Sequence, residues 1–196
     1  SNVIVYNAAI SACEKAGEWQ MALILLAGCQ DQQVEANDFA YSAAISACEK
    51  GSRWPEALHL LQTFATSKGS VDVVMYNAAI SAMEDWRGAL ALLAELQEQQ
   101  LLPSVISYNA CLSAIKGGAW VNALEILSEM LERSLEATLI TYNTLISALA
   151  TSYDSWPLGL MILEALPILT LRPNKLTYTA AMSACEQGEC WDGALQ

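Results

Sequence analysis

The chain has 196 residues, of which 54% are hydrophobic and 15% are charged, and its formal net charge is −12. This composition excludes intrinsic disorder, because disordered chains have few apolar and many charged residues. The acidic balance argues against generic electrostatic attraction to nucleic acid or to an anionic membrane. No apolar stretch is both long enough for a membrane span and free of charge or proline, so we expect no membrane-spanning segment.

Two aromatic landmarks recur along the chain and predict its architecture. A tyrosine followed by a small polar residue occurs at Tyr6, Tyr41, Tyr76, Tyr108, Tyr142 and Tyr178. All six tryptophans keep register with these tyrosines: Trp19, Trp54, Trp86, Trp120, Trp156 and Trp191. Repetition every 32 to 36 residues, in a chain rich in helix-forming Ala and Leu, is typical of stacked helical hairpins.

The predicted elements are therefore six repeats, each with a first helix that carries the tyrosine and a second helix that starts near the tryptophan. In chain order they span residues 3–37, 38–72, 73–104, 105–138, 139–174 and, as a partial repeat, 175–196. Gly-containing segments such as 15–18 and 116–119 predict a turn between the two helices. The expected fold class is an all-α, right-handed α-solenoid of about six helix–turn–helix repeats.

The spacing of the landmarks indicates where the repeats tolerate a change in length. Each tryptophan is followed by the next tyrosine after 22 residues, whereas the distance from a tyrosine to its own tryptophan varies from 10 to 14 residues. Insertions are thus expected in the turn inside each hairpin, and the junction between repeats is expected to be constant.

The tyrosines, the tryptophans and the Ala-Leu pairs three residues after the tryptophans are expected to form the core. We expect Cys13, Cys48, Cys111 and Cys185 to be small buried thiols of the first helices. Cys29 and Cys190 are isolated, and the single histidine, His59, stands in a second helix. These residues predict no catalytic site, no metal site and no cofactor.

The first repeat unit resembles a pentatricopeptide repeat, similar to the P type, over residues 3–17 and the Trp-x-x-Ala-Leu second helix that follows. The resemblance extends from Val3 to Gln196. In tetratricopeptide repeats, the nearest alternative, the tryptophan lies in the first helix, whereas here it opens the second.

The resemblance implies binding of single-stranded RNA, with one base read by each repeat. Bases would be read by the residue after each tyrosine together with the last residue of the repeat. These pairs are Asn7 with Asn37, Ser42 with Asp72, Asn77 with Ser104, Asn109 with Thr138, and Asn143 with Asn174, and Thr179 begins a sixth pair. Apolar residues two before each tyrosine would wedge between bases: Ile4, Phe39, Val74, Ile106, Ile140 and Leu176.

By the family's code, the implied RNA sequence is a pyrimidine, a guanine, three pyrimidines and a purine. Lys15 and Lys50 would contact phosphate groups. The second residue of each pair also has a purely structural interpretation, because Asn, Asp, Ser and Thr before a helix are favoured N-caps. The polar residue after each tyrosine lowers helix propensity, which favours a line of side chains that faces a ligand. A polar rim kept through repeat duplication is the alternative.

Three functional interpretations remain open at this point. The first is RNA binding that supports RNA processing, stability or editing in a chloroplast or mitochondrion, as the family implies, with no membrane and no DNA partner. The second is a protein-binding scaffold with an acidic concave surface, which the charge of −12 favours. In the third, a catalytic domain follows beyond Gln196, because we expect the chain to be a segment of a longer protein.

Overall fold

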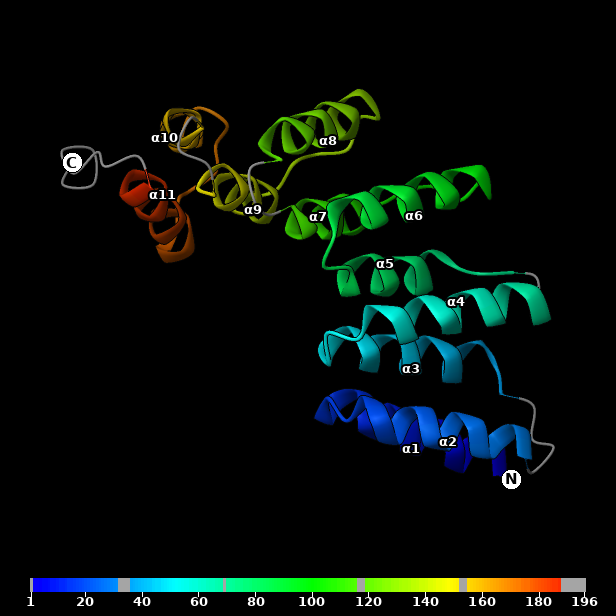
Figure 1. The fold of residues 1–196 in the computed structure, drawn as a ribbon. Coiled ribbons are helices and arrows are strands. Elements are labelled where there is room, and N and C mark those ends of the chain that lie inside the picture. The colour runs from blue at the N-terminus through cyan, green and yellow to red at the C-terminus, as the bar shows by residue number, and fades with distance from the viewer. Residues whose placement is uncertain (1, 32–35, 69, 116–118, 152–154, 188–196) are drawn as a thin grey trace. The chain divides into compact units, whose positions relative to one another are not determined.

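The computed structural model describes residues 2–31, 36–68, 70–115, 119–151 and 155–187. Within these ranges the chain forms eleven α-helices and no β-strand (Figure 1). In chain order the helices are α1 (Asn2–Ala16), α2 (Trp19–Asp31), α3 (Asp38–Lys50), α4 (Trp54–Lys68), α5 (Val73–Ala82), α6 (Trp86–Glu98), α7 (Val105–Ala114), α8 (Trp120–Glu132), α9 (Leu139–Leu149), α10 (Trp156–Ala165) and α11 (Lys175–Gln187). Cys190, Trp191 and most of the turn expected at residues 116–119 lie outside the described residues.

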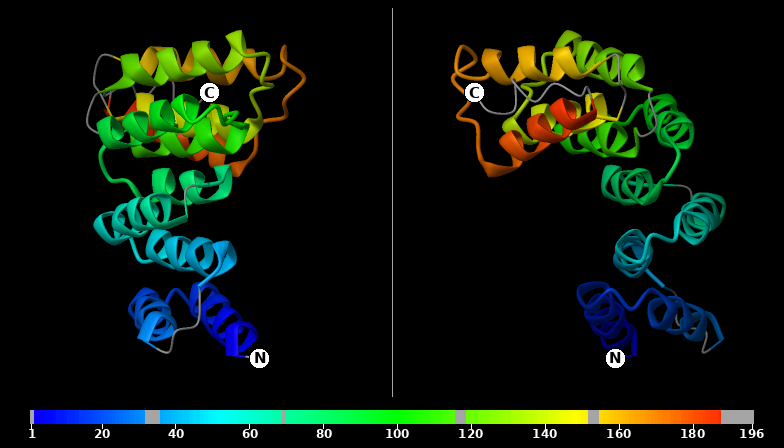
Figure 2. Two further views of the ribbon diagram at one scale, coloured as in Figure 1. Left: turned by 90° about the vertical axis from the view of Figure 1, so that its right-hand side faces the viewer. Right: turned by 60° about the vertical axis from the view of Figure 1, so that its left-hand side comes forward.

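The helices form two compact units: unit 1, Ser1–Pro103, contains α1–α6, and unit 2, Ser104–Gln196, contains α7–α11. In unit 1 the tyrosine-bearing first helices α1, α3 and α5 pack against one another in chain order. The second helices α2 and α4 each pack against their own first helix and against the first helix of the next hairpin. Within unit 2, α7 to α11 follow the same pattern (Figure 2). The predicted all-α architecture of helical-hairpin repeats is thereby confirmed.

Alanines line the surfaces where these helices meet. Ala22, Ala57, Ala89 and Ala123, each three residues after a tryptophan, are all 0% exposed. Because an alanine has no side chain beyond Cβ, the backbones of two helices can approach closely while still excluding water. The alanine of the predicted Ala-Leu landmark is thus part of the core.

The tyrosines follow the core prediction in part. Tyr41, Tyr76 and Tyr108 are buried, whereas Tyr178 is 54% exposed. Tyr178 lies in α11, and the residues after Gln187 are not among those described. Tyr6 and Tyr142 are partly buried, so the core prediction holds fully for three of the six tyrosines.

The prediction that the tryptophans form the core is wrong. Trp54 is 40% exposed, and Trp19, Trp86, Trp120 and Trp156 are only partly buried. Each of these five tryptophans is the first residue of a second helix, as the sequence predicted. That position lies at the end of the hairpin. The burial of an indole there depends on the turn of a neighbouring repeat.

Three junctions between repeats share one backbone arrangement. Gln100, Ser134 and Thr170 each lie fourteen residues after the tryptophan that begins α6, α8 or α10, and all three have positive φ angles, of 58°, 60° and 62°. The next residue closes the helix in each case, for example by a hydrogen bond from Leu135 N to Met130 O of 3.1 Å. This is the Schellman arrangement, which fixes the direction of the outgoing chain.

The thiol prediction is largely confirmed. Cys48, Cys111 and Cys185 are buried, but Cys13 is only half-buried because α1 packs against a neighbouring hairpin on one side only. His59 is exposed on α4. No helix in the described part of the chain is both long and apolar enough to cross a membrane.

Candidate functional site

All six apolar residues predicted to wedge between bases are exposed. Their exposed fractions are 75% for Ile4, 54% for Phe39, 59% for Val74, 64% for Ile106, 66% for Ile140 and 68% for Leu176. Isolated apolar side chains on a surface are common, but a large one at the same position of every first helix forms an ordered line. These residues are therefore available to a ligand and contribute little to the core.

The polar residue after each tyrosine follows its wedge residue by three positions. Residues three apart in a helix lie on the same face, so each first helix presents the two side chains together. Asn7, Ser42, Asn77, Asn109 and Asn143 are partly buried, and Thr179 is exposed. The Oδ1 atoms of Asn109 and Asn143 are buried and accept no hydrogen bond within the protein. A buried oxygen without a partner is unfavourable by about 1–3 kcal/mol, so these atoms would gain from a donor on a ligand.

The last residue of each predicted repeat caps the helix that follows. Asp72 accepts a hydrogen bond from Met75 N at 2.8 Å. Equivalent bonds are made by Asn37 to Ala40 N at 3.1 Å, Ser104 to Ser107 N at 3.4 Å, Thr138 to Thr141 N at 3.4 Å and Asn174 to Thr177 N at 3.0 Å. In the last three cases the capped residue also accepts from the backbone N–H of the cap. Each bond satisfies an N–H group at the start of a helix that otherwise has no partner.

One predicted reading pair is in direct contact. Asn143 Nδ2 on α9 lies 3.5 Å from Asn174 Oδ1, to which it donates a hydrogen bond. Asn174 therefore touches the reading residue of its own repeat while it also caps α11. In the third pair, Asn77 belongs to unit 1 and Ser104 to unit 2.

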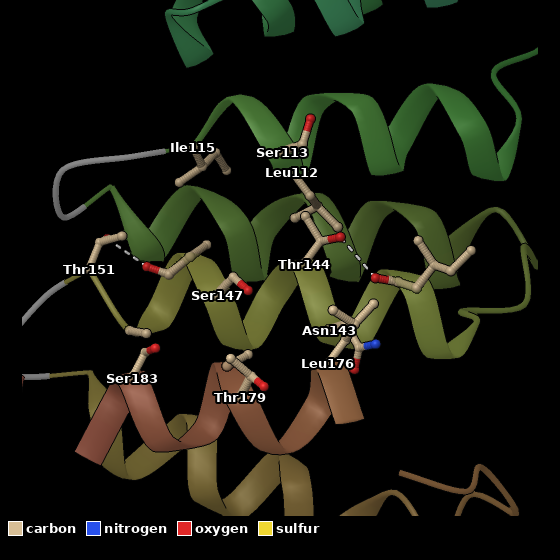
Figure 3. A pocket seen from close by; sticks show the side chains of 14 residues that line it. Leu112, Ser113, Ile115, Asn143, Thr144, Ser147, Thr151, Leu176, Thr179 and Ser183 are labelled. Atoms are coloured by element: carbon tan, nitrogen blue, oxygen red, sulfur yellow. Dashed lines mark hydrogen bonds between the residues drawn. The ribbon is translucent and has the colours of Figure 1, made fainter. Parts of the chain in front are cut away.

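A groove of about 650 Å³ runs over the first helices of unit 2 (Figure 3). Both the wedge residues Ile140 and Leu176 and the reading residues Asn143 and Thr179 line it. Its walls combine apolar side chains with hydroxyl groups, and no charged side chain of the described residues takes part. Such a surface suits a flat, largely apolar group with polar edges.

Sequence reasoning missed a line of serines in this groove. Ser113, Ser147 and Ser183 line it, and each follows its landmark tyrosine by five residues. The same spacing occurs in all six repeats, with Ser11, Ser46 and Ser81 in the first three. Because the serine is four residues beyond the reading residue, it lies on the same helical face. This recurrence was the signal that could have identified it.

The two predicted phosphate contacts differ in their surroundings. Lys15 is exposed near the end of α1. Lys50 Nζ lies 3.2 Å from the Glu14 carboxylate and 3.0 Å from the Glu14 carbonyl oxygen. An exposed ion pair of this kind is worth about 0–1 kcal/mol, so a phosphate group could displace it.

The described part of the chain offers few side chains that could bind a metal ion or act as a nucleophile. No group of three or more His, Cys, Asp or Glu side chains there could hold a metal ion. Burial raises the pKa of the Cys48 thiol to about 11 and that of Cys111 to about 12. Both thiols are therefore protonated and poorly nucleophilic near neutral pH.

Known structures share this fold. The RNA-bound crystal structure of the pentatricopeptide repeat protein PPR10 superposes with a TM-score of 0.83 at 21% identity, over 100% of this chain and 29% of PPR10. The crystal structure of PPR10 from maize gives a TM-score of 0.70 at 24% identity, over 97% of this chain and 28% of PPR10. The PPR domain of Arabidopsis thaliana protein-only RNase P 1, crystallised with tRNA, gives 0.74 at 16% identity, over 95% and 100%. These identities establish the fold, and the chain spans less than a third of PPR10.

Family models agree with the structural comparison, although a search of curated proteins finds no match. The PPR repeat model matches residues 4–28, the pentatricopeptide repeat domain model matches 59–118, and the PPR repeat family model matches 103–151. Together these matches cover more than half of the sequence, in the repeats predicted from the tyrosine and tryptophan landmarks. The chain belongs to the pentatricopeptide repeat family.

Proposed function

We propose that the chain binds single-stranded RNA along its first helices, with one base at each repeat. The observation that carries this proposal is the groove in unit 2, where wedge residues and reading residues line one surface. The crystal structures of PPR10 and of the PPR domain of protein-only RNase P 1 are complexes with an RNA element and with tRNA, which supports the same class of ligand here.

The groove would bind a base through its faces and its edge. Ile140 and Leu176 would contact the two faces of a base between α9 and α11, since apolar contact with a base does not depend on its sequence. Asn143 would then meet the edge. An asparagine amide offers both donors and an acceptor, and the unpartnered Oδ1 atom is the acceptor that remains free.

The guanine proposed for the second base has a chemical basis. Ser42 and Asp72 form this pair, and an ionised carboxylate only accepts hydrogen bonds. The Watson–Crick edge of guanine presents N–H donors, so Asp72 would complement it. With pyrimidines at the first, third, fourth and fifth positions and a purine at the sixth, C-G-C-C-C-A is a matching probe.

The charge of the chain sets the strength and the salt dependence of this binding. Lys15 and Lys50 are the proposed phosphate contacts, and the net charge is −12. Two contacts release few counterions, so affinity should be modest and should depend mostly on bases. Repeats in the remainder of a longer protein would add to it.

Membership of the family supports a proposal for the biological setting. We propose that the chain contributes a sequence-reading segment to RNA processing, stability or editing in a chloroplast or mitochondrion. The segment itself would act by occupying RNA, and any catalytic step would be performed by another domain or protein.

Asp72→Asn separates base reading from helix capping. Asparagine accepts the same capping bond from Met75 N, so the melting temperature should stay within about 2 °C, which corresponds to less than about 0.5 kcal/mol. Fluorescence anisotropy with C-G-C-C-C-A in short flanks should nevertheless show at least a fivefold loss of affinity. The matched control is Asp38→Asn, which removes the same charge from the first turn of α3.

The outcome decides between reading and scaffolding. If the wild-type chain binds C-G-C-C-C-A and a scrambled oligonucleotide equally, or binds neither, RNA reading is contradicted and the protein-scaffold function is favoured. If Asp72→Asn and Asp38→Asn change affinity by the same factor, Asp72 acts through charge or capping and does not read the base.

A change of code at the fifth repeat tests the modular mechanism. The double variant Asn143→Thr/Asn174→Asp keeps an N-cap at residue 174 and should move the preferred fifth base from a pyrimidine to guanine. The measurement compares oligonucleotides that differ only at that base. An unchanged preference would contradict one-base-per-repeat reading at α9.

A further inference from the structure

The indole of Trp19 is covered by the turn of the next repeat. A Cβ atom added at Gly51 would overlap Cδ1 of Trp19, so the backbone at Gly51 lies directly against the ring. Arg53 Cζ lies 4.6 Å from the centroid of the same indole. The Arg53 guanidinium also donates a hydrogen bond from Nε to Glu56 Oε1 at 3.1 Å. One arginine thus lies over the aromatic face and pairs with a carboxylate.

The next junction has the same tryptophan without this cover. Three residues separate the first helix from the next tryptophan at both junctions, but the helix α5 has 10 residues whereas α3 has 13, so the first helix is three residues shorter at this junction. The residue before the following tryptophan is Asp85, which occupies the sequence position of Arg53. Trp54 is 40% exposed as a consequence.

A pocket of about 480 Å³ lies beside Trp54 in unit 1. Trp54, Leu58 and Met83 supply apolar surface, and Glu84, Asp85 and Glu95 supply three carboxylates. No basic side chain of the described residues lines the pocket. The side chain of Asp85 makes no capping hydrogen bond at the start of α6.

Three basic side chains of unit 1 have partners outside the pocket. Lys50 pairs with Glu14, and Arg53 remains with Trp19 and Glu56. Arg87 Cζ lies 4.8 Å from the ring centroid of its neighbour Trp86. The carboxylates of the pocket therefore meet no partner of opposite charge from these side chains.

We propose that this pocket binds an arginine side chain presented by a basic segment of a protein partner. The guanidinium would stack on Trp54 as Arg53 does on Trp19, and Asp85 and Glu84 would accept its N–H groups. Arginine fits better than lysine because its planar fork can stack on an indole and pair with a carboxylate at once. The net charge of −12 would attract a basic segment over longer distances.

The proposal is independent of RNA binding. The pocket is formed by the second helices α4 and α6 and by the turn before α6. None of the residues proposed to read or wedge bases lines it. A partner could therefore be bound while the first helices are occupied by RNA.

A fluorescein-labelled peptide of three Arg-Gly-Gly units is a direct probe, measured by anisotropy against the 196-residue chain. We expect binding that falls at least tenfold when citrulline, which has the same shape without the charge, replaces each arginine. A lysine version should bind more weakly than the arginine peptide. Asp85→Arg should abolish binding, because it supplies the chain's own cation to Trp54.

Controls distinguish the pocket from general acidity. Glu136→Arg makes the same charge change at an exposed position of unit 2 and should weaken binding by less than twofold. Should Asp85→Arg alter folding, the double variant Glu84→Gln/Asp85→Asn keeps both side-chain sizes and should still lower affinity at least fivefold. Trp54→Leu should do the same.

The proposal is overturned if the citrulline peptide binds as well as the arginine peptide. It is equally overturned if Asp85→Arg and Glu136→Arg weaken binding by the same factor, because the interaction would then be with the overall charge. RNA affinity should respond equally to these two variants, so a failure here would leave RNA reading intact.

Discussion

Two hairpins bury their equivalent tyrosines, Tyr41 and Tyr108, in different ways. In α3–α4, Tyr41 packs against Phe64, with ring centroids 5.0 Å apart and planes at 51°. In α7–α8, Tyr108 donates its hydroxyl hydrogen to Glu129 Oε1 at 3.0 Å, and α5–α6 repeats this bond from Tyr76 to Glu95 at 3.0 Å. The tyrosine ring thus contacts another aromatic ring in one hairpin, and the tyrosine hydroxyl bonds to a carboxylate in two others.

The difference arises on the second helix. The residue nine positions after each tryptophan is Gly28, Thr63, Glu95, Glu129 and Ala165 in turn. Of these five residues, Glu95 and Glu129 are the ones that accept the tyrosine hydrogen bonds described above. The hairpins that bury their tyrosine therefore do not need one particular partner for it, since burial of the ring provides most of the stabilisation.

The largest effect is expected from Phe64→Ala. Phe64 is 1% exposed, and its removal leaves a cavity beside Tyr41 that neighbouring helices cannot close completely. We expect a loss of about 3–5 kcal/mol in the free energy of unfolding, measured by urea denaturation. The exposed Phe39 on α3 is the matched control, and Phe39→Ala should cost less than about 1 kcal/mol. Equal losses would show that the contact with Tyr41 is not what stabilises this hairpin.

A smaller effect is expected from Glu129→Ala. The hydroxyl of Tyr108, whose ring is 0% exposed, would lose its acceptor, at a cost of about 1–3 kcal/mol. Glu129→Gln keeps an acceptor and should recover most of the loss, and Glu132→Ala on the exposed face is the control. If Glu129→Gln is as damaging as Glu129→Ala, the charge of the glutamate matters more than its hydrogen bond.

Gly28→Ala should stabilise the chain. A Cβ atom at Gly28 would lie 3.8 Å from Tyr6 Oη, which is an ordinary contact, and alanine favours a helix over glycine. We expect a gain of about 0.5–1 kcal/mol, measured by the same denaturation. A loss would mean that Tyr6 needs the space next to α2.

The smallest effect is expected in mild alkali. Burial raises the pKa of the Cys111 thiol from 9.0 to about 12. Between these values the unfolded chain loses the proton while the folded chain keeps it, so stability falls as the pH rises. At pH 9.0 half of the unfolded thiol is ionised, and the loss is about 0.4 kcal/mol. Comparing pH 7 with pH 9, Cys111→Ala should reduce the change by that amount, and an unaltered change would contradict the burial argument.

Local sequence signals predicted the elements of this fold well. Each second helix begins at a tryptophan, and Asn37, Asp72, Ser104 and Thr138 cap the first helices that follow. Caps and helical periodicity depend on residues within one or two turns, so they can be identified without a structure. The same periodicity placed the wedge and reading residues on one face, whereas the serines beside them were overlooked.

By itself, the sequence determined the repeat, the helix starts and the face that carries the candidate RNA site, because these depend on contacts a few residues apart. Only the tertiary structure decided which aromatic rings are covered. Trp19 and Trp54 have the same place in their repeats, but one meets Gly51 and Arg53 and the other opens onto an acidic pocket. That difference depends on the next hairpin, where the first helix is three residues shorter and Asp85 replaces Arg53, and burial of a side chain is decided by whatever packs against it.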